Sequence, residues 1–561
     1  MTSLKEVKTL SNGTTMSIMQ HAASIIEKLN DTVDGVDTFY ICDLGASAKL
    51  CRHLSAVMPR VAPYYAVKCF PDPKLLATLA ACGAGFDCAS AGELKQVLSL
   101  GVDPNRVVFA NPCKRFVDLK CIAHNKVPHT TFDSACELEK IASGCSDVGA
   151  VLRIRADDTT ARMPFGVKYG ALPSEVPELL KHALELGVAV SGVSFHVGSG
   201  AGNPMAFHDA IAAARRVRDE LCALDGAAKS RLFLLDIGGG FTGGFNTEGQ
   251  AFVSVGSSEG CAHHDEVAHV INKALDEFFD PFEFSDGGLK VISEPGRYFA
   301  EASAHVVTRV FGKRVRSNTA SVDPGAGAAG STREAGDAAA TTTLQTKRAE
   351  VQAGGGHRRL VLRSAIDPSW RGDADRDDAG SSNQEEGRQE EQRHPREKQQ
   401  EQQQQPAVSP PSKEVHYYIS DGIYGGFNAI VYDGWLPKAV PFRALAGKAS
   451  AVTSNPAAPT DACVSTIFGP TCDSLDMVFH GLPDCPTLEI GDWLLFPNCG
   501  AYTAAGATDF NGIPSSPFMN SGTKMNYVYA RSHAVPDCER GSGAPKVLFS
   551  ATAPLSVTKN Y

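Results

Sequence analysis

Short apolar runs alternate with helix-length amphipathic segments between residues 64 and 297. The runs that predict strands lie at residues 64–68, 85–89, 106–110, 129–133, 150–154, 192–196, 232–237 and 290–294. Strands that alternate with helices form parallel βα units, and eight such units close a barrel. The pattern therefore predicts an α/β protein with a (β/α)8 TIM-like barrel. Polar and glycine-rich motifs at many of the strand ends favour the barrel over the alternative, a doubly wound open sheet.

A second, all-β domain is predicted from the two ends of the chain. The segments TFYICDL, YYISDG, NAIVYD, CVSTIFG and GDWLLF read as strands that are separated by Gly, Pro and Asp turns. We expect residues 1–45 to complete this C-terminal β domain, residues 46–298 to form the barrel, and residues 299–316 and 414–561 to form the rest of the β domain.

Residues 317–413 depart from both patterns. From Gln384 to Pro406 the chain has nine Gln and six Glu among 23 residues, with no aliphatic or aromatic side chain. This composition cannot build a core, so we expect a disordered low-complexity insertion. The β-branched and aromatic segments SAHVVTRVFGKRV and VHYYISDG flank it. They predict two adjacent strands, with the insertion lengthening the loop of one hairpin.

Composition then narrows the classes of function. The 561 residues include 53 Lys plus Arg and 63 Asp plus Glu, which gives a formal net charge of −10 with histidine neutral. This charge argues against general binding to nucleic acid or to an anionic membrane. The chain has no apolar run of signal-peptide or membrane-span length, and its 16 cysteines show no CxxC spacing. We therefore expect a cytoplasmic protein with reduced thiols.

Candidate chemistry collects at the ends of the predicted barrel strands. Lys68 ends the first strand, where a lysine with a depressed pKa can form a Schiff base, although a lysine that merely caps a strand end is the commoner case. Three glycines, Gly238 to Gly240, follow the seventh strand, and Gly296 with Arg297 follows the eighth. Such loops can cradle a phosphate through backbone N–H groups and a bidentate guanidinium.

Further residues at the same strand ends complete the set. Glu294 precedes the Gly296 loop and can pair with a protonated ring nitrogen. His196 ends the sixth strand with a flat ring, and Ser199 and Gly200 offer another phosphate loop. An amine, a phosphate cradle, a carboxylate and a flat ring around one barrel mouth match the requirements of pyridoxal 5'-phosphate.

The chain also carries a set of motifs in a characteristic order: YYAVKC, FDCASAGEL, FANPCK, TFDS, SFHVGSG, LDIGGGF, SEPGRYF, DGIYGGFN, GPTCDSLD and GDWLLFPNCGAYT. This set resembles the eukaryotic ornithine decarboxylases, which belong to the alanine-racemase-like, fold III pyridoxal phosphate enzymes. The resemblance covers nearly the whole chain except the insertion and the extreme ends. It implies a homodimer that decarboxylates L-ornithine to putrescine, the entry step of polyamine biosynthesis, with antizyme as a candidate partner. The alternatives are lysine or arginine decarboxylation and a catalytically inactive regulator similar to antizyme inhibitors.

Carried over motif by motif, the resemblance implies a role for each site residue. Lys68 would be the Schiff-base lysine, His196 the ring-stacking residue and Glu294 the partner of the pyridine nitrogen. The other cofactor-binding residues would be Asp87, Arg153, Ser199, Gly238, Gly239, Gly240, Pro295, Gly296, Arg297 and Tyr502.

The resemblance also implies a site shared between two subunits. Cys472 would protonate the substrate carbon, and Cys472 and Asp473 would act across the interface. Tyr432 and Asp433 would come from the subunit that holds the cofactor. The carboxylates of Asp433 and Asp473 would then bind the distal ammonium of the substrate.

Two features lie outside this shared pattern. The segment ARMPFGVKYG, which includes Arg162, is closer to plant-like than to animal sequences, and we expect it to touch none of the site residues. A second cluster, Cys261, His263, His264 and His269, matches no zinc template and leads into a helix. We favour a solvated helix start there over a metal site and expect no metal.

Overall fold

The computed structural model describes residues 14–30, 37–156, 160–163, 168–230, 233–246, 248–255, 265–285, 288–317, 413–445, 448–451, 463–482, 487–513 and 526–530. The predicted disorder concerns residues that lie outside these ranges, apart from the two ends of the insertion. Cys261, His263 and His264 also lie outside them. None of the helices in these ranges combines the length and the hydrophobicity that a membrane span needs.

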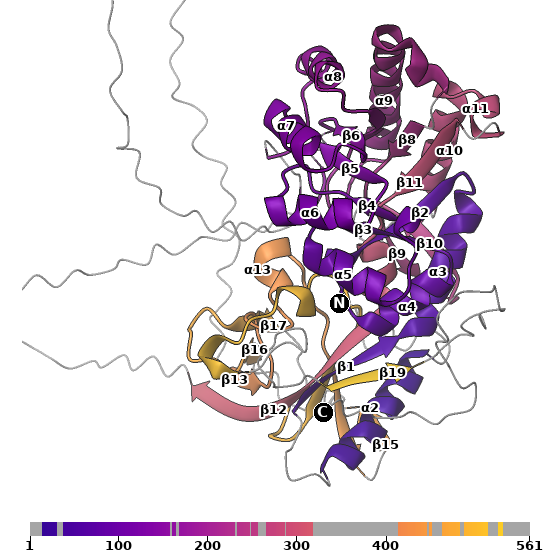
Figure 1. Cartoon of the computed structure of the whole chain (residues 1–561). Coiled ribbons are helices and arrows are strands. Elements are labelled where there is room, and N and C mark those ends of the chain that lie inside the picture. The colour runs from indigo at the N-terminus through magenta and orange to yellow at the C-terminus, as the bar shows by residue number, and fades with distance from the viewer. Residues whose placement is uncertain are drawn as a thin grey trace, which may run out of the picture.

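Eight parallel strands close into a barrel in the order β11, β2, β3, β4, β5, β6, β7, β8 (Figure 1). They are β2 (Val61–Ala66), β3 (Gly85–Cys88), β4 (Val107–Phe109), β5 (His129–Phe132), β6 (Gly149–Arg153), β7 (Val190–Ser194), β8 (Phe233–Asp236) and β11 (Leu289–Ser293). The accompanying helices are α3 (Leu44–Val57), α4 (Pro73–Ala81), α5 (Ala91–Ser99), α6 (Phe116–His124), α7 (Ala135–Gly144), α8 (Val176–Glu185), α9 (Met205–Leu224), α10 (Glu266–Phe278), α11 (Pro281–Ser285) and α12 (Arg297–Ala300). The predicted (β/α)8 barrel is confirmed.

Side-chain alternation along the barrel strands separates two apolar layers. Tyr64, Val108, Val151, Leu234 and Ile292 form a small buried cluster, whereas their sequence neighbours pack with the surrounding helices. Successive strand residues point to opposite faces, so the small cluster fills the barrel interior. The interior is therefore packed, and chemistry belongs at the carboxyl ends of the strands.

Side-chain caps close the loops after the first two barrel strands. Asp72 Oδ1 accepts hydrogen bonds from the N–H groups of Lys74 and Leu75 at the start of α4. Ser90 Oγ accepts from the N–H of Glu93 at the start of α5. These caps satisfy N–H groups that have no partner within the helix, so each helix begins at a fixed residue.

Shorter elements complete the connections. A two-stranded sheet of β9 (Thr242–Phe245) and β10 (Ala251–Ser254) follows β8. The 3-10 helices are η1 (Val67–Cys69), η2 (Pro104–Arg106), η3 (Gly226–Ser230), η4 (Glu301–Ser303), η5 (Ala504–Gly506) and η6 (Phe510–Gly512). The first of these, η1, directly follows β2 at the barrel mouth and carries the candidate lysine.

A nine-stranded mixed sheet is built from both ends of the chain, as predicted. Its main path runs β15, β14, β18, β12, β13, β16, β17, and β1 pairs with both β12 and β19. The strands are β1 (Thr38–Asp43), β12 (Ala304–Ser317), β13 (Lys413–Ile419), β14 (Val440–Leu445), β15 (Lys448–Ala451), β16 (Cys463–Phe468), β17 (Met477–Leu482), β18 (Trp493–Phe496) and β19 (Asn526–Ala530). We call this sheet and its connections the β domain.

The strands on either side of the predicted insertion pair with each other. β12 and β13 are antiparallel, and their pairing extends to Ser317 opposite Lys413. Figure 1 shows β12 as a long strand that runs from the barrel to the far end of the β domain beside β13. The prediction that the insertion joins two adjacent strands is confirmed.

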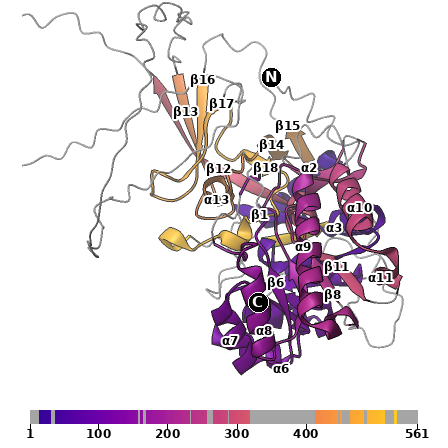
Figure 2. The ribbon, with the colours of Figure 1, turned by 90° about the horizontal axis from the view of Figure 1, so that it is seen from above.

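The N-terminal helix α2 (Thr14–Asn30) packs beside β14 and β15 (Figure 2). Ile18 and Ile25 of this helix share a buried cluster with Phe39, Phe442 and Trp493 of the sheet. The cluster is separate from the main core that fills the space between barrel strands and helices. The N-terminal part of the chain thus contributes both a strand and a covering helix to the β domain.

One predicted strand of the β domain is wrong. The run NAIVYD forms the short helix α13 (Ala429–Asp433). The side chain of Asn428, which precedes it, donates to the carbonyls of Gly425 and Thr503, and Gly434 ends the helix with φ 61°. Turn chemistry at both ends therefore outweighs the strand preference of the β-branched residues.

Candidate active site

Lys68 lies on η1, two residues beyond the end of β2. Its Nζ donates a hydrogen bond to Oδ2 of Asp87 on β3 at 2.6 Å. The Asp87 side chain is fully buried, whereas 44% of the Lys68 side chain is exposed. The amine is therefore held at one point while it stays open to the barrel mouth.

The charge of Lys68 differs from the expectation. Burial lowers the pKa of Lys68, but Asp87, Tyr502 and Glu294 together raise it above its ordinary value. The prediction of a depressed pKa is therefore wrong for this structure. The main reason is Asp87, whose carboxylate lies 2.6 Å from the ammonium of Lys68.

A pair of carboxyl groups, the buried Asp236 and the half-buried Glu294, lies beside this lysine. Glu294 directly follows β11, and Asp236 is the last residue of β8. Burial raises the pKa of Glu294 well above its ordinary value, and Asp236 and Asp87 raise it further. Burial also raises the pKa of Asp236 to about 6, although hydrogen bonds from Glu294 and from the Gly238 N–H oppose the rise. The pair therefore holds a proton, with Glu294 as the donor.

Sequence reasoning missed Asp236. Its only signal was its place in LDIGGGF, two residues before the first glycine. The residue ends an apolar strand, and its partner Glu294 is far away in the sequence, so no local pattern joins the two.

His196 is held as a neutral ring. The Gly198 N–H donates to Nδ1 of His196 at 3.1 Å, which requires that nitrogen to be unprotonated. Burial, and then the positive charges of Arg153 and Lys68, lower the pKa of His196 well below its ordinary value. A neutral, flat imidazole at this position suits stacking rather than charge pairing.

The predicted glycine loop packs backbone against backbone. A Cβ on Gly238, whose φ is +64°, would lie 2.2 Å from the Phe195 carbonyl oxygen. A Cβ on Gly240 would lie 2.7 Å from the Gly198 carbonyl oxygen. Only glycine therefore lets the loop after β8 approach the loop that carries His196.

Arg297 joins the loops at the mouth. Its Nε donates to Ser199 Oγ at 2.9 Å, and its guanidinium lies 4.6 Å from the centre of the Tyr502 ring. The Tyr502 N–H donates to the carbonyl of Cys69 at 3.0 Å. A Cβ on Gly296 would lie 3.0 Å from the Cys69 Cβ. The structure thus brings together the predicted phosphate residues from four segments of the chain.

Asp433 also meets Arg297. Arg297 Nη2 donates to Asp433 Oδ1 at 2.6 Å, and both side chains are nearly buried. Tyr432, its neighbour on α13, is 73% exposed. Of the two predicted substrate residues on α13, only Asp433 is therefore placed at the phosphate loops by the described contacts.

Arg162 overturns the expectation that its segment touches no site residue. Its Nη1 lies 3.5 Å from Asp433 Oδ2. The N–H of Arg162 donates to the Gly200 carbonyl, and Met163 pairs with Ser199 through two backbone hydrogen bonds. The spacing of ARMPFGVKYG gave no sign of these contacts, because they depend on how residues 160–163 lie on a loop from another strand.

Arg153 and Pro295, two of the predicted cofactor-binding residues, act on the site through their charge and through a backbone hydrogen bond. Arg153 ends β6, and its guanidinium lies 5.3 Å from the ring centre of Tyr169. Its charge is near enough to lower the pKa of His196 and of Asp236. The Pro295 carbonyl accepts a hydrogen bond from the Ala66 N–H at 3.4 Å. Both therefore support the site through its surroundings.

Cys472 and Asp473 lie apart from this constellation in the described contacts. Cys472 is exposed, and its N–H donates to Asn511 Oδ1 at 2.9 Å. Asp473 accepts hydrogen bonds from the Tyr424 hydroxyl and from the Leu475 N–H. All of these contacts are within the β domain.

Two residues that support the Cys472 loop were missed by sequence reasoning. Tyr424 holds Asp473, and its ring stacks on Phe510 with 4.2 Å between ring centres. The buried Asp476 accepts hydrogen bonds from the N–H groups of Ile423 and Thr471. The motifs DGIYGGFN and GPTCDSLD contained both residues, but only the fold shows that the two loops are joined.

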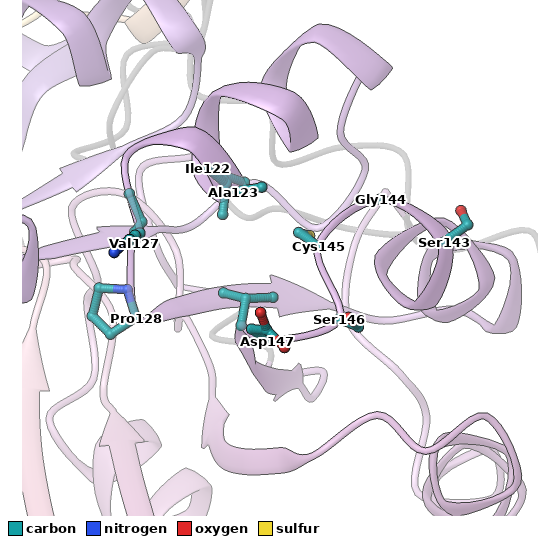
Figure 3. A pocket seen from close by; sticks show the side chains of 11 residues that line it. Ile122, Ala123, Val127, Pro128, Ser143, Gly144, Cys145, Ser146 and Asp147 are labelled. Atoms are coloured by element: carbon teal, nitrogen blue, oxygen red, sulfur yellow. The ribbon is translucent and has the colours of Figure 1, made fainter.

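A separate cavity lies at the opposite end of the barrel (Figure 3). Its volume is about 500 Å³, and its lining includes Val127 and Pro128 before β5 and Cys145 to Asp147 before β6. These residues precede their strands, so the cavity opens at the amino ends of the barrel. It is therefore distinct from the site around Lys68.

The site chemistry fits pyridoxal phosphate. Asp87 Oδ1 and Asp236 Oδ2 are buried acceptors for which the described residues offer no donor, next to a carboxyl pair that holds a proton. The glycine loop packs too closely on the neighbouring loops to accept a Cβ, and it lies beside the loop of a buried arginine. An amine, a proton-holding carboxyl pair and an anion cradle are the donor set that this cofactor needs.

Comparison with known proteins agrees with this arrangement. The profile of the pyridoxal binding domain of pyridoxal-dependent decarboxylases matches residues 45–301, and the profile of their C-terminal sheet domain matches residues 395–500. Ornithine decarboxylase of Rattus norvegicus is 33% identical over 489 residues, which cover 87% of this chain and 81% of the relative. The chain belongs to the pyridoxal-dependent decarboxylases.

Solved structures place this decarboxylase among enzymes named for different amino acids. The arginine decarboxylase of Paramecium bursaria Chlorella virus, solved with agmatine, is 26% identical with a TM-score of 0.62 and covers 91% of this chain and 100% of its own. Lysine decarboxylase from Selenomonas ruminantium is 25% identical with a TM-score of 0.57, and the match covers 88% of this chain and 93% of the relative. The decarboxylase is therefore a pyridoxal phosphate-dependent carboxy-lyase.

Proposed function

We propose that this decarboxylase converts L-ornithine to putrescine and CO2. The observation that carries the proposal is Asp433, a nearly buried carboxylate that Arg297 holds at the edge of the phosphate loops. A carboxylate at that edge suits the distal ammonium of a diamino acid whose α-amine is at Lys68. The relative from Rattus norvegicus, named for ornithine, supports the same substrate.

The residues of the chain divide the work of this reaction. Bound pyridoxal phosphate supplies an electron sink, because its ring accepts the electron pair that departing CO2 leaves behind. Lys68 would hold the cofactor covalently, and Arg297 and Ser199 would hold its phosphate with the glycine loop. Glu294, backed by Asp236, would keep a proton at the ring nitrogen.

Two further residues would act on the ring face and on the substrate. His196 presents a neutral ring, because Gly198 donates to its Nδ1, and would support one face of the cofactor. Cys472 would deliver a proton to the substrate α-carbon as a thiol donor. Its exposed position within the β domain leaves it available to another subunit.

We propose a homodimer with shared sites on that basis. In the part of the chain that the structure describes, the contacts of Cys472 and Asp473 are with β-domain residues, so a second copy would have to present them to Lys68. Mixing inactive Lys68→Ala and Cys472→Ala subunits tests this directly. Random reassociation should restore about a quarter of the wild-type activity, since half of the dimers are mixed and each has one intact site. A mixture that stays inactive would show that each site is complete within one subunit.

The choice of substrate is tested by CO2 release from ornithine, lysine, arginine and diaminopimelate. Wild-type protein should prefer ornithine, and Cys472→Ala should lose turnover while the cofactor absorbance persists. A preference for lysine or arginine would keep the reaction and refute the pocket assignment. Cofactor binding without turnover of any of the four would move the protein to the inactive, antizyme-inhibitor-like class.

A further inference from the structure

The carboxylate of Asp433 is bound by two arginines from different parts of the barrel. Arg297 Nη2 lies 2.6 Å from Oδ1, and Arg162 Nη1 lies 3.5 Å from Oδ2. The exposed side-chain fractions are 7% for Asp433, 6% for Arg297 and 24% for Arg162. Each carboxylate oxygen therefore faces its own cation in a nearly closed setting.

Residues 160–163 hold Arg162 in this position through the backbone. The Arg162 N–H donates to the Gly200 carbonyl at 2.8 Å, and Met163 and Ser199 exchange two hydrogen bonds in an antiparallel bridge. A Cβ on Gly202 would lie 2.5 Å from Thr160 Oγ1, so the segment lies close along the loop after β7. Arg162 is thus held by backbone hydrogen bonds against the loop after β7, and Ser199 of this same loop binds Arg297.

A second carboxyl group lies within the electrostatic reach of both arginines. Glu301, at the start of η4, is half-buried, and the loss of solvent around its carboxyl raises its pKa overall, although Arg162 and Arg297 lower it. The Tyr502 ring lies under the Arg297 guanidinium. Both arginines therefore lower the pKa of Glu301 through their charge, whereas their direct contacts are with Asp433.

Arg297 has two candidate anionic partners, the carboxylate of Asp433 and the phosphate of the cofactor. It binds Asp433 in this structure, and it is also the buried arginine of the phosphate cradle together with Ser199. A phosphate dianion that engages Arg297 would compete with Asp433 for the same charge, and a buried carboxylate that loses its cation is costly. In the described part of the chain, Arg162 is the cation that still contacts Asp433.

We propose that Arg162 is a positioning residue that holds Asp433 ready for the distal amine of the substrate while the cofactor phosphate occupies Arg297. This assignment rests on the proposed function, since it takes Asp433 as the group that recognises the amine. Arg162 acts through Asp433 and takes no part in the chemical step. Loss of Arg162 would leave Asp433 beside the phosphate without its second cation, and its carboxylate would turn away or take up a proton.

The test compares Arg162→Met, Arg162→Lys and the control Arg216→Met in the pyridoxal phosphate-loaded enzyme. Arg216 is exposed on α9, so its variant removes the same charge and side-chain shape away from Asp433. We expect Arg162→Met to raise the KM for ornithine by on the order of tenfold with kcat nearly unchanged. Arg162→Lys should recover part of the loss, and Arg216→Met should match wild type.

Putrescine binding separates this inference from the proposed function. Putrescine has the distal amine but no carboxyl group, so its dissociation constant, measured by calorimetry on the loaded enzyme, reports amine recognition without turnover. Arg162→Met should weaken putrescine binding by the same factor and leave the cofactor dissociation constant within about twofold of wild type. Loss of cofactor affinity with unchanged putrescine binding would overturn the proposal, because residues 160–163 would then only build the phosphate site. Wild-type protein that releases no CO2 from ornithine would refute the proposed function, while unchanged putrescine binding by Arg162→Met would refute the role of Arg162.

Discussion

Gly238→Ala should damage both the fold and the cofactor site, and a matched glycine isolates the cause. Gly238 has φ +64° and Gly187 has φ +68°, so an alanine at either position meets the same backbone penalty, about 1–2 kcal/mol. The surroundings differ. A Cβ at Gly238 would lie 2.2 Å from the Phe195 carbonyl oxygen, whereas a Cβ at Gly187 would have nothing within 4 Å.

The difference between the two variants therefore measures the contact alone. Overpacking a tight site costs about 1–3 kcal/mol, so Gly238→Ala should lower the free energy of unfolding by that much more than Gly187→Ala. The backbone that must move to relieve this contact carries His196. Gly238→Ala should therefore also weaken the binding of the cofactor. If all of this free energy were lost from cofactor binding, the dissociation constant for pyridoxal phosphate would rise roughly 5- to 150-fold.

Urea unfolding of both variants, with cofactor titration followed by absorbance, makes the measurement. Gly187→Ala should lose stability and keep wild-type cofactor affinity, since Gly187 lies just before the amino end of β7. Equal losses of stability and equal cofactor affinities in the two variants would refute the reasoning, because the close approach of the two loops would then have no energetic effect.

Three further outcomes are expected. Replacing residues 318–412 with Asn-Gly should leave ornithine turnover near wild type, because Ser317 already pairs with Lys413 and a two-residue turn can join them; a large loss of turnover in soluble protein would contradict this. Glu294→Gln should lower kcat by roughly 100-fold while the cofactor stays bound, because an amide cannot hold the ring proton; steady-state kinetics with absorbance measures both. Burial raises the pKa of Asp421 to about 7 from 3.8, so the folded state binds its proton more tightly than the unfolded state does. The free energy of unfolding should therefore fall as the pH rises from about 4 to about 7. Asp421→Asn should make this fall smaller, which urea unfolding at a series of pH values measures.

The barrel could be predicted because its signal is local. Each strand is an apolar run beside an amphipathic helix, and the strand ends carry Lys68, His196 and Glu294 directly. The helix at residues 429–433 could not be predicted in the same way, because its β-branched residues favour a strand and the bonds that decide it come from Asn428 and Thr503.

The parts of the site that were missed depend on contacts between distant segments. Asp236 becomes important only when β8 and β11 lie side by side and bring it to Glu294. Arg162 reaches Asp433 only because residues 160–163 lie along the Ser199 loop. Neither relation leaves a spacing or a motif in the sequence. In the proposed homodimer, the position of Cys472 relative to Lys68 would depend on a second chain, which no pattern within one sequence shows.

One backbone hydrogen bond has a consequence for how this chain can be divided. The Tyr502 N–H, which belongs to the β domain, donates to the carbonyl of Cys69, the residue after Lys68, and the Tyr502 ring lies beneath Arg297. A barrel expressed without the β domain would lose both contacts at once. Truncation at the domain boundary should therefore yield a barrel whose reactive turn is untethered, and exchange of whole barrels between relatives would succeed only when the matching Tyr502 segment travels with them.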